Sequence, residues 1–90
     1  MKKIVIPAED FSTEEELQDF LQDAFGFPNY YGKNLDALYD CLSELDEKVR
    51  IEVSGAIADE ENLGEYGERF LTVLEEASKD NEDIKLKITE

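Results

Sequence analysis

Three short runs rich in β-branched residues, separated by stretches with helical spacing, constrain the fold of this chain most strongly. The runs lie at residues 2–6, 49–53 and 84–88, and the last two alternate apolar with polar residues. Such alternation is typical of strands with one solvated face, and helical crossovers between strands predict parallel pairing with right-handed connections. We therefore expect an α/β fold of two layers, with a three-stranded parallel sheet and helices packed mainly on one face.

Helical periodicity predicts three helices between these strands. The first follows Ser12, which is spaced as a capping box with Glu15, and it ends at Gly26, where a left-handed cap is expected. The second begins after Asn34, a favourable N-cap, and carries a leucine stripe. The third occupies residues 66–77, whereas residues 56–63 predict at most one turn.

Length and cysteine usage limit the organisation of the chain. Ninety residues suffice for one compact domain, which we expect to span residues 1–90. The single cysteine, Cys41, excludes an intramolecular disulfide, and its place beside the leucine stripe predicts a small buried apolar side chain. No leader-like segment is seen, and the longest apolar run is far shorter than the roughly 20 residues of a membrane span. We expect a cytoplasmic protein without a membrane partner.

Acidic residues outnumber basic ones by 24 to 9, which gives a formal net charge of -15. Nucleic acids and anionic lipids would be repelled at long range, so these partners are not expected. A cationic partner is favoured, although an acidic composition can also serve solubility alone.

The residue types present exclude most enzymatic mechanisms. With no histidine and one cysteine, the chain assembles neither a Ser-His-Asp or Cys-His relay nor a structural zinc site. The five glycines are isolated, so no phosphate-binding loop is formed. We expect no cofactor, no metal and no enzyme activity. An enzyme based on paired carboxylates is the weakest alternative, and it would require turnover without a partner.

Polar residues of the second helix gather on the face opposite its leucines. At about 100° per residue, this face contains Asp36, Asp40, Ser43 and Glu44. Like charges four residues apart destabilise a helix, and the preceding loop adds Tyr30 and Tyr31, aromatics of the kind found in interface hot spots. The pattern favours a binding surface. The alternatives are an ordinary solvated helix face and a loop in which one tyrosine closes on the core.

Residues 28–42, Pro-Asn-Tyr-Tyr-Gly-Lys-Asn-Leu-Asp-Ala-Leu-Tyr-Asp-Cys-Leu, resemble the binding segment of the barstar family, intracellular inhibitors of barnase-type ribonucleases. Residues 73–77 resemble the late helix of that family, and the expected order of elements agrees along the whole chain. The resemblance implies a barstar-like fold and a non-enzymatic inhibitor. It also implies a 1:1 complex with a basic, guanyl-preferring ribonuclease, and a monomer when free.

The resemblance also implies a role for each residue of the binding surface. Asp40 would stand where an RNA phosphate binds, Tyr30 would stack against the catalytic region, and Asp36 and Glu76 would pair with basic residues. Asn34 would fix the geometry between loop and helix. Together with the polar face predicted from helical spacing, the complete set expected for partner binding is Tyr30, Asn34, Asp36, Tyr39, Asp40, Ser43, Glu44 and Glu76.

Three positions depart from the family pattern. Familiar members carry tryptophan where Tyr39 and Leu45 stand, and glycine where Glu44 stands. A glutamate adds bulk and charge where a glycine lets two backbones approach, so the cognate nuclease can differ from barnase. The alternative function is therefore an acidic adaptor, or an immunity protein that binds another basic partner or nuclease toxin.

Overall fold

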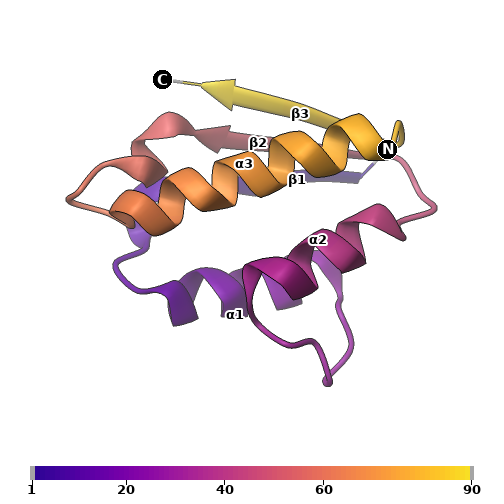
Figure 1. The fold of residues 1–90 in the computed structure, drawn as a ribbon, viewed down its shortest axis with the longest axis horizontal. Helices are drawn as coiled ribbons and strands as arrows, with labels where there is room; N and C mark the ends of the chain where they lie inside the picture. Colours follow the sequence, from indigo (N-terminus) through magenta and orange to yellow (C-terminus); the bar gives the residue numbers. More distant parts are fainter. Residues whose placement is uncertain (1, 90) are drawn as a thin grey trace.

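A three-stranded parallel sheet forms one layer of the protein. In the computed structural model, which describes residues 2–89, its strands are β1 (Lys2–Ile6), β2 (Val49–Ser54) and β3 (Ile84–Thr89), in the order β1-β2-β3. Both pairs are parallel, and Ile4, Ile51 and Leu86 lie in register across the sheet. The expected parallel α/β fold is confirmed (Figure 1).

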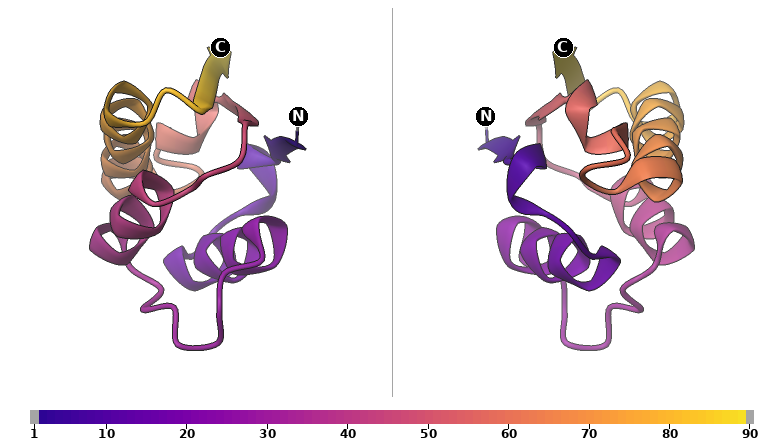
Figure 2. Two further views of the ribbon diagram at one scale, coloured as in Figure 1. Left: turned by 90° about the vertical axis from the view of Figure 1, so that its right-hand side faces the viewer. Right: turned by 90° about the vertical axis from the view of Figure 1, so that its left-hand side faces the viewer.

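Three α-helices form the second layer: α1 (Glu14–Phe25), α2 (Leu35–Ser43) and α3 (Gly64–Asp80). Two short 3-10 helices, η1 (Ala8–Asp10) and η2 (Gly55–Ala58), follow β1 and β2. Side views show all three α-helices on the same side of the sheet, as expected from the alternating strands (Figure 2). None of these helices is both long and apolar enough to cross a bilayer.

The core lies between the sheet and these helices. Val49, Ile51 and Val53 of β2 point into it, while Arg50 between them is exposed. They meet fully buried side chains from all three helices: Leu17, Leu21, Leu38, Leu42, Phe70 and Leu74. Burying each large aliphatic side chain contributes about 1.5–3 kcal/mol, so this shared core positions the helices on one another.

The N-terminus of α1 differs from the predicted capping box by one residue. Thr13, not Ser12, is the N-cap: its Oγ1 accepts the Glu16 N–H at 3.1 Å, and its own N–H donates to Glu16 Oε1 at 3.0 Å. Glutamates at 14, 15 and 16 supply a carboxylate to either register. Bonds from Ser12 and Thr13 lower the pKa of Glu16, with the Ser12 N–H the largest cause. At the other end, Gly26 is left-handed with φ 70°, as predicted.

The structure defines three further local features. Residues 56–63 contribute one turn of 3-10 helix at most, and Ile57 within it is fully buried, so this segment is packed into the core. Helix α2 ends at Ser43, which leaves Leu45 beyond it although Leu45 still packs against the core. Cys41 lies half-buried at the margin of the core rather than inside it, and burial raises the pKa of its thiol.

Candidate functional site

The loop between α1 and α2 is anchored by Tyr31. Its side chain is buried, and its hydroxyl donates to Gln18 Oε1 at 2.5 Å while the Gln18 amide donates to Tyr66 Oη at 2.7 Å. The ring lies 4.8 Å from that of Phe27, measured between centroids. Burial raises the pKa of Tyr31 far above its usual value. One of the two loop tyrosines therefore closes on the core, as considered from the sequence.

Tyr30, the neighbouring residue, is presented to solvent with 89% of its surface exposed. A second contact steadies the loop beyond it: Lys33 Nζ lies 2.7 Å from Asp19 Oδ1 of α1. This contact raises the pKa of Lys33, whose backbone adopts an uncommon left-handed φ of 53°. Tyr30 is thus an exposed aromatic that immediately precedes two anchored residues of the loop, Tyr31 and Lys33.

Asn34 makes the turn from this loop into α2. Its Oδ1 accepts the Ala37 N–H at 2.7 Å, and its Nδ2 donates to the Gly32 carbonyl at 3.3 Å. Gly32 is closely packed here, because a Cβ at this position would lie 3.2 Å from Ala37 Cβ. The N-cap predicted at Asn34 is confirmed, and it sets the direction in which α2 leaves the loop.

Carboxylates from α2 and α3 converge on a hollow of about 310 Å³ between the two helices. Its lining consists of Leu35, Asp36, Tyr39, Asp40, Val73 and Glu76. No lysine or arginine lines it, and none of its three acids forms an ion pair within residues 2–89. We call the face formed by Asp36, Tyr39, Asp40 and Glu76 around this hollow the acidic face.

Asp80 joins the acidic face through Tyr39, although sequence reasoning did not single it out. The Tyr39 hydroxyl donates to Asp80 Oδ2 in the last turn of α3. This hydrogen bond, more than partial burial, raises the pKa of Tyr39. The signal in the sequence was its spacing, since residues four apart share a helix face and Asp80 follows Glu76 by four.

Ser43 and Glu44 lie outside the hollow. The Ser43 hydroxyl donates to the carbonyl of Asp40 at 2.9 Å, within its own helix. Glu44 is the C-cap of α2, and its side chain is exposed. The structure therefore brings together Asp36, Tyr39, Asp40 and Glu76 of the predicted set. Tyr30, Asn34, Ser43 and Glu44 lie along the adjoining loop and helix ends.

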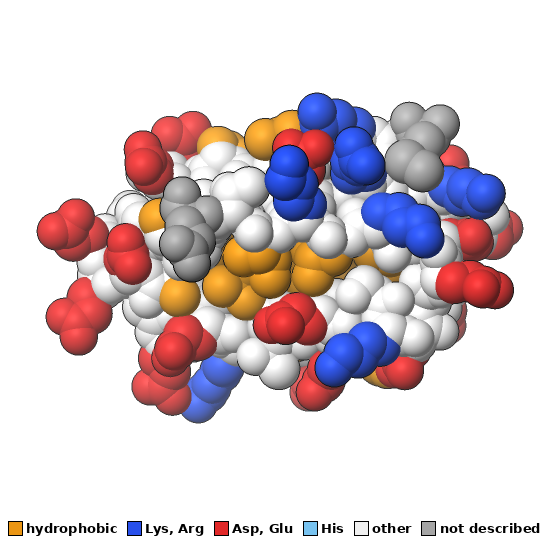
Figure 3. Space-filling view, turned by 90° about the horizontal axis from the view of Figure 1, so that it is seen from above, with side chains coloured by type: hydrophobic (Ala, Val, Ile, Leu, Met, Phe, Trp, Pro, Cys, Tyr) orange, Lys and Arg blue, Asp and Glu red, His pale blue; other side chains and the backbone are white. Residues whose placement is uncertain are grey.

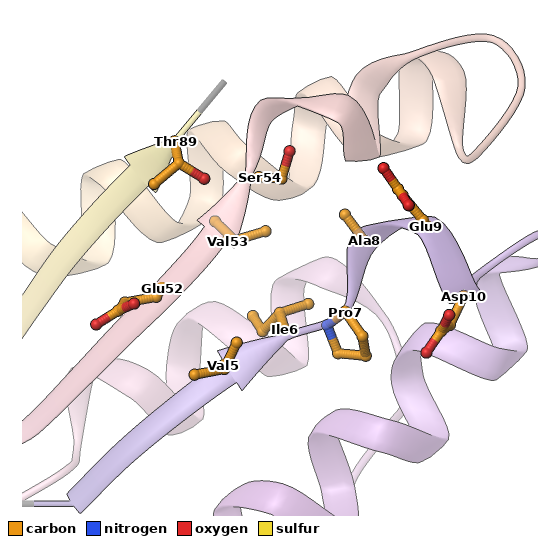
Figure 4. A pocket seen from close by; sticks show the side chains of 10 residues that line it. All are labelled: Val5, Ile6, Pro7, Ala8, Glu9, Asp10, Glu52, Val53, Ser54 and Thr89. Carbon is orange, nitrogen blue, oxygen red and sulfur yellow. The ribbon is translucent and has the colours of Figure 1, made fainter.

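A second hollow of about 310 Å³ lies at the carboxyl ends of the strands, where ligands often bind in open α/β sheets (Figure 4). Much of its wall is apolar, including Val5, Pro7 and Val53. Glu9 and Asp10 project from η1 in different directions, so their charges do not converge as those of the acidic face do (Figure 4). Within residues 2–89, no cluster of histidine, cysteine or acidic residues is arranged to hold a metal ion.

Comparison with known proteins connects this geometry to a family. The family model described as Barstar (barnase inhibitor) matches residues 1–89. A relative from Bacillus subtilis (strain 168), named "Putative ribonuclease inhibitor YrdF", is 39% identical over 84 residues, which cover 92% of each chain. The match spans both helices of the acidic face and all three strands. The chain therefore belongs to the barstar family.

Proposed function

We propose that this protein inhibits a ribonuclease by occupying its active site with the acidic face and the adjoining Tyr30 loop. The observation that carries the proposal is the convergence of Asp36, Asp40 and Glu76 on one hollow without a cation among its lining residues. Family membership and the name of the Bacillus relative support the same role. The protein acts by blocking access and performs no turnover of its own.

Electrostatic mimicry is the proposed mechanism. A ribonuclease must present arginine, lysine or histidine to bind RNA phosphates, and charge-assisted hydrogen bonds to carboxylates satisfy the same groups. Asp40 occupies the phosphate position, while Asp36 and Glu76 meet basic residues around it. Because α2 is fixed by its N-cap and by Leu38 and Leu42 in the core, the backbone that carries its carboxylates needs little further ordering on binding.

The distribution of charge favours rapid capture of a basic enzyme. Six of the nine lysines and arginines lie in or beside the strands, away from the acidic face: Lys2, Lys3, Lys48, Arg50, Lys85 and Lys87. The acids of the helical side are therefore largely unopposed. Such complementarity can raise association rates to about 10⁸–10⁹ M⁻¹s⁻¹ at low salt. The proposed partner is a secreted, guanyl-preferring ribonuclease. The protein binds this enzyme 1:1 in the cytoplasm before the enzyme is exported.

The direct test is calorimetric titration into barnase, at low and at physiological salt, with RNA cleavage measured in parallel. Tight 1:1 binding that weakens with salt and abolishes cleavage is expected. Asp40→Asn keeps the side-chain shape and removes the charge, so it should weaken both the binding and the inhibition of cleavage. Glu60→Gln removes one charge from the exposed turn before α3 and serves as the matched control.

The presence of Glu44 supports a second candidate function, which is inhibition of a nuclease other than barnase. Its exposed side chain stands at the end of α2, where familiar barstars carry glycine. A partner with a basic residue facing Glu44 would gain a contact that barnase does not offer. Tight binding to another nuclease toxin, with barnase bound weakly, would select this candidate. Binding to any partner without loss of its RNA cleavage would instead indicate an adaptor and contradict inhibition.

A further inference from the structure

Strand β3 leaves one edge of the sheet unpaired within residues 2–89. It pairs only with β2, and the views agree that no described element covers its outer side (Figures 1 and 2). The Val49 N–H donates to the Asp83 carbonyl at 2.9 Å, so alternate residues of β3 face β2. The backbone groups of Leu86 and Ile88 consequently face outward, free to pair with another strand.

A groove with both apolar and charged walls runs along this free edge. A hollow of about 410 Å³ is lined by Ile84, Lys85, Leu86 and Ile88 on the strand and by Glu75, Ser78 and Lys79 on α3. Ile88 is 39% exposed although its side chain points to the helical side of the sheet. Seen from above, a band of hydrophobic side chains lies between lysines and arginines on one side and mixed charges on the other (Figure 3).

Lysines flank the groove on the open face of the sheet. Lys85 lies opposite Arg50 in register, and neither forms an ion pair within residues 2–89. Lys87 lies opposite Glu52, but that carboxylate is 3.3 Å from the Nζ of Lys3. Like charges directly opposite each other destabilise a sheet, so acidic side chains beside β3 would relieve this arrangement.

We propose that the β3 edge binds an extended segment of a partner protein in which apolar and acidic residues alternate. The segment adds a fourth strand and pairs with the outward backbone groups of Leu86 and Ile88. Its apolar side chains enter the groove below, and its acidic side chains lie beside Lys85 and Lys87. A second copy of this chain fits poorly, because antiparallel pairing of two β3 strands would place these lysines opposite each other.

The edge lies apart from the acidic face, so its occupation leaves the proposed inhibitory surface free. The hollow of the acidic face and the β3 groove share no lining residue. The protein could then hold a nuclease and the acidic segment together. Failure of one interaction would therefore not imply failure of the other, and barnase inhibition can be measured beside edge binding in each variant.

A short synthetic peptide of alternating glutamate and valine, blocked at both ends, provides the probe. NMR titration of the full chain should shift β3 resonances and slow exchange of the Leu86 and Ile88 amide protons. Lys85→Glu with Lys87→Glu should weaken binding by roughly tenfold and create binding to a lysine-valine peptide. The matched control, Lys2→Glu with Lys48→Glu, reverses two exposed charges by the other edge and should leave the affinity unchanged.

A backbone variant separates strand addition from charge attraction alone. Ile88→Pro removes an outward N–H and should abolish binding, whereas Ile88→Thr keeps this donor and should retain binding. Urea denaturation verifies that both variants fold. Three outcomes would overturn the proposal: equal peptide affinity after reversal of Lys85 and Lys87, peptide shifts on α2 instead of β3, or protection of the β3 amides by self-association without peptide.

Discussion

The hydroxyl of Tyr39 on α2 donates a hydrogen bond to the carboxylate of Asp80 in the last turn of α3. The two residues lie 41 positions apart in the chain, so the contact joins two independent helices of the acidic face. A carboxylate acceptor favours the neutral phenol and is the main reason that the pKa of Tyr39 is raised. Familiar barstars with tryptophan at this position cannot make the same bond, because the indole carries no hydroxyl.

Asp80→Asn should lower the pKa of Tyr39 toward its ordinary value, because the charged acceptor is removed. The measurement is an NMR titration of the tyrosine ring resonances at alkaline pH. Tyr31 serves as the internal control, since its pKa is raised chiefly by burial and should change little. An unchanged titration of Tyr39 in the variant would show that the bond to Asp80 does not form in solution.

Asp40→Asn should leave the free protein equally or more stable, while it weakens nuclease binding by about 2 kcal/mol or more. Asp36 and Asp40 are four residues apart on one helix and lack ion pairs within residues 2–89. Their repulsion costs about 0.2–0.5 kcal/mol, which the variant recovers. Urea denaturation of this variant and of the Glu60→Gln control compares their free energies of unfolding with that of the parent protein. A clear loss of stability would assign Asp40 a structural role.

The buried Tyr31 should make folding stability fall at alkaline pH. Its pKa is raised in the folded state, mainly by burial, whereas the unfolded chain ionises near about pH 10. The contribution is therefore complete below that pH and is lost as the pH rises toward the folded pKa. Once the unfolded tyrosine ionises, the loss from this group is about 1.4 kcal/mol per pH unit. Urea unfolding as a function of pH measures this slope.

Tyr31→Phe should reduce the alkaline slope but lower the stability at neutral pH. The Gln18 carbonyl oxygen, which accepts the Tyr31 hydroxyl, would be left buried without this donor. Such a loss costs about 1–3 kcal/mol. Tyr30→Phe is the matched control, because this tyrosine is 89% exposed and should alter neither quantity. An unchanged slope in Tyr31→Phe would place the alkaline transition on another group.

Gly67→Ala should destabilise the protein, although alanine is the better helix former by about 1 kcal/mol. Gly67 lies inside α3, and a Cβ built there would come within 2.0 Å of the Ile57 carbonyl oxygen in η2. The helix packs directly on this backbone, so relief requires α3 or η2 to move. We expect a loss above about 3 kcal/mol, measured by urea denaturation. Equal or greater stability would contradict the close packing of α3 on η2.

The sheet and its helices could be predicted because their signals are local. Alternation in residues 49–53 and 84–88 is confirmed in β2 and β3, and the stop at Gly26 is confirmed by its left-handed φ of 70°. The cap at Thr13 was missed by one residue, because consecutive glutamates satisfy either register of the capping box. Sequence spacing therefore established the elements, while their exact ends required backbone geometry.

The candidate site depends on contacts that sequence spacing does not specify. Tyr30 and Tyr31 are adjacent and chemically identical, yet only Tyr31 finds a buried partner, which is Gln18 on α1. The convergence of Glu76 with Asp40 likewise depends on how α3 packs against α2. The resemblance to barstars supplied Glu76 but not Asp80, whose contact with Tyr39 uses a hydroxyl absent from the familiar members.

Glu44→Gly should increase affinity for barnase by about tenfold or more, equivalent to 1.4 kcal/mol or more. Glu44 is the C-cap of α2 and its side chain is exposed. The bulk of this side chain prevents close approach by a partner whose surface is complementary to a glycine at this position. Stability should change little, because relief of an unfavourable charge at the helix C-terminus offsets the extra freedom of glycine.

Glu44→Gln separates charge from bulk, and Glu47→Gly is the matched control in the exposed turn after α2. Calorimetric titration into barnase compares them. If Glu44→Gly and Glu47→Gly bind barnase as the parent does, partner choice depends on other departures, with Tyr39 and Leu45 the next to replace.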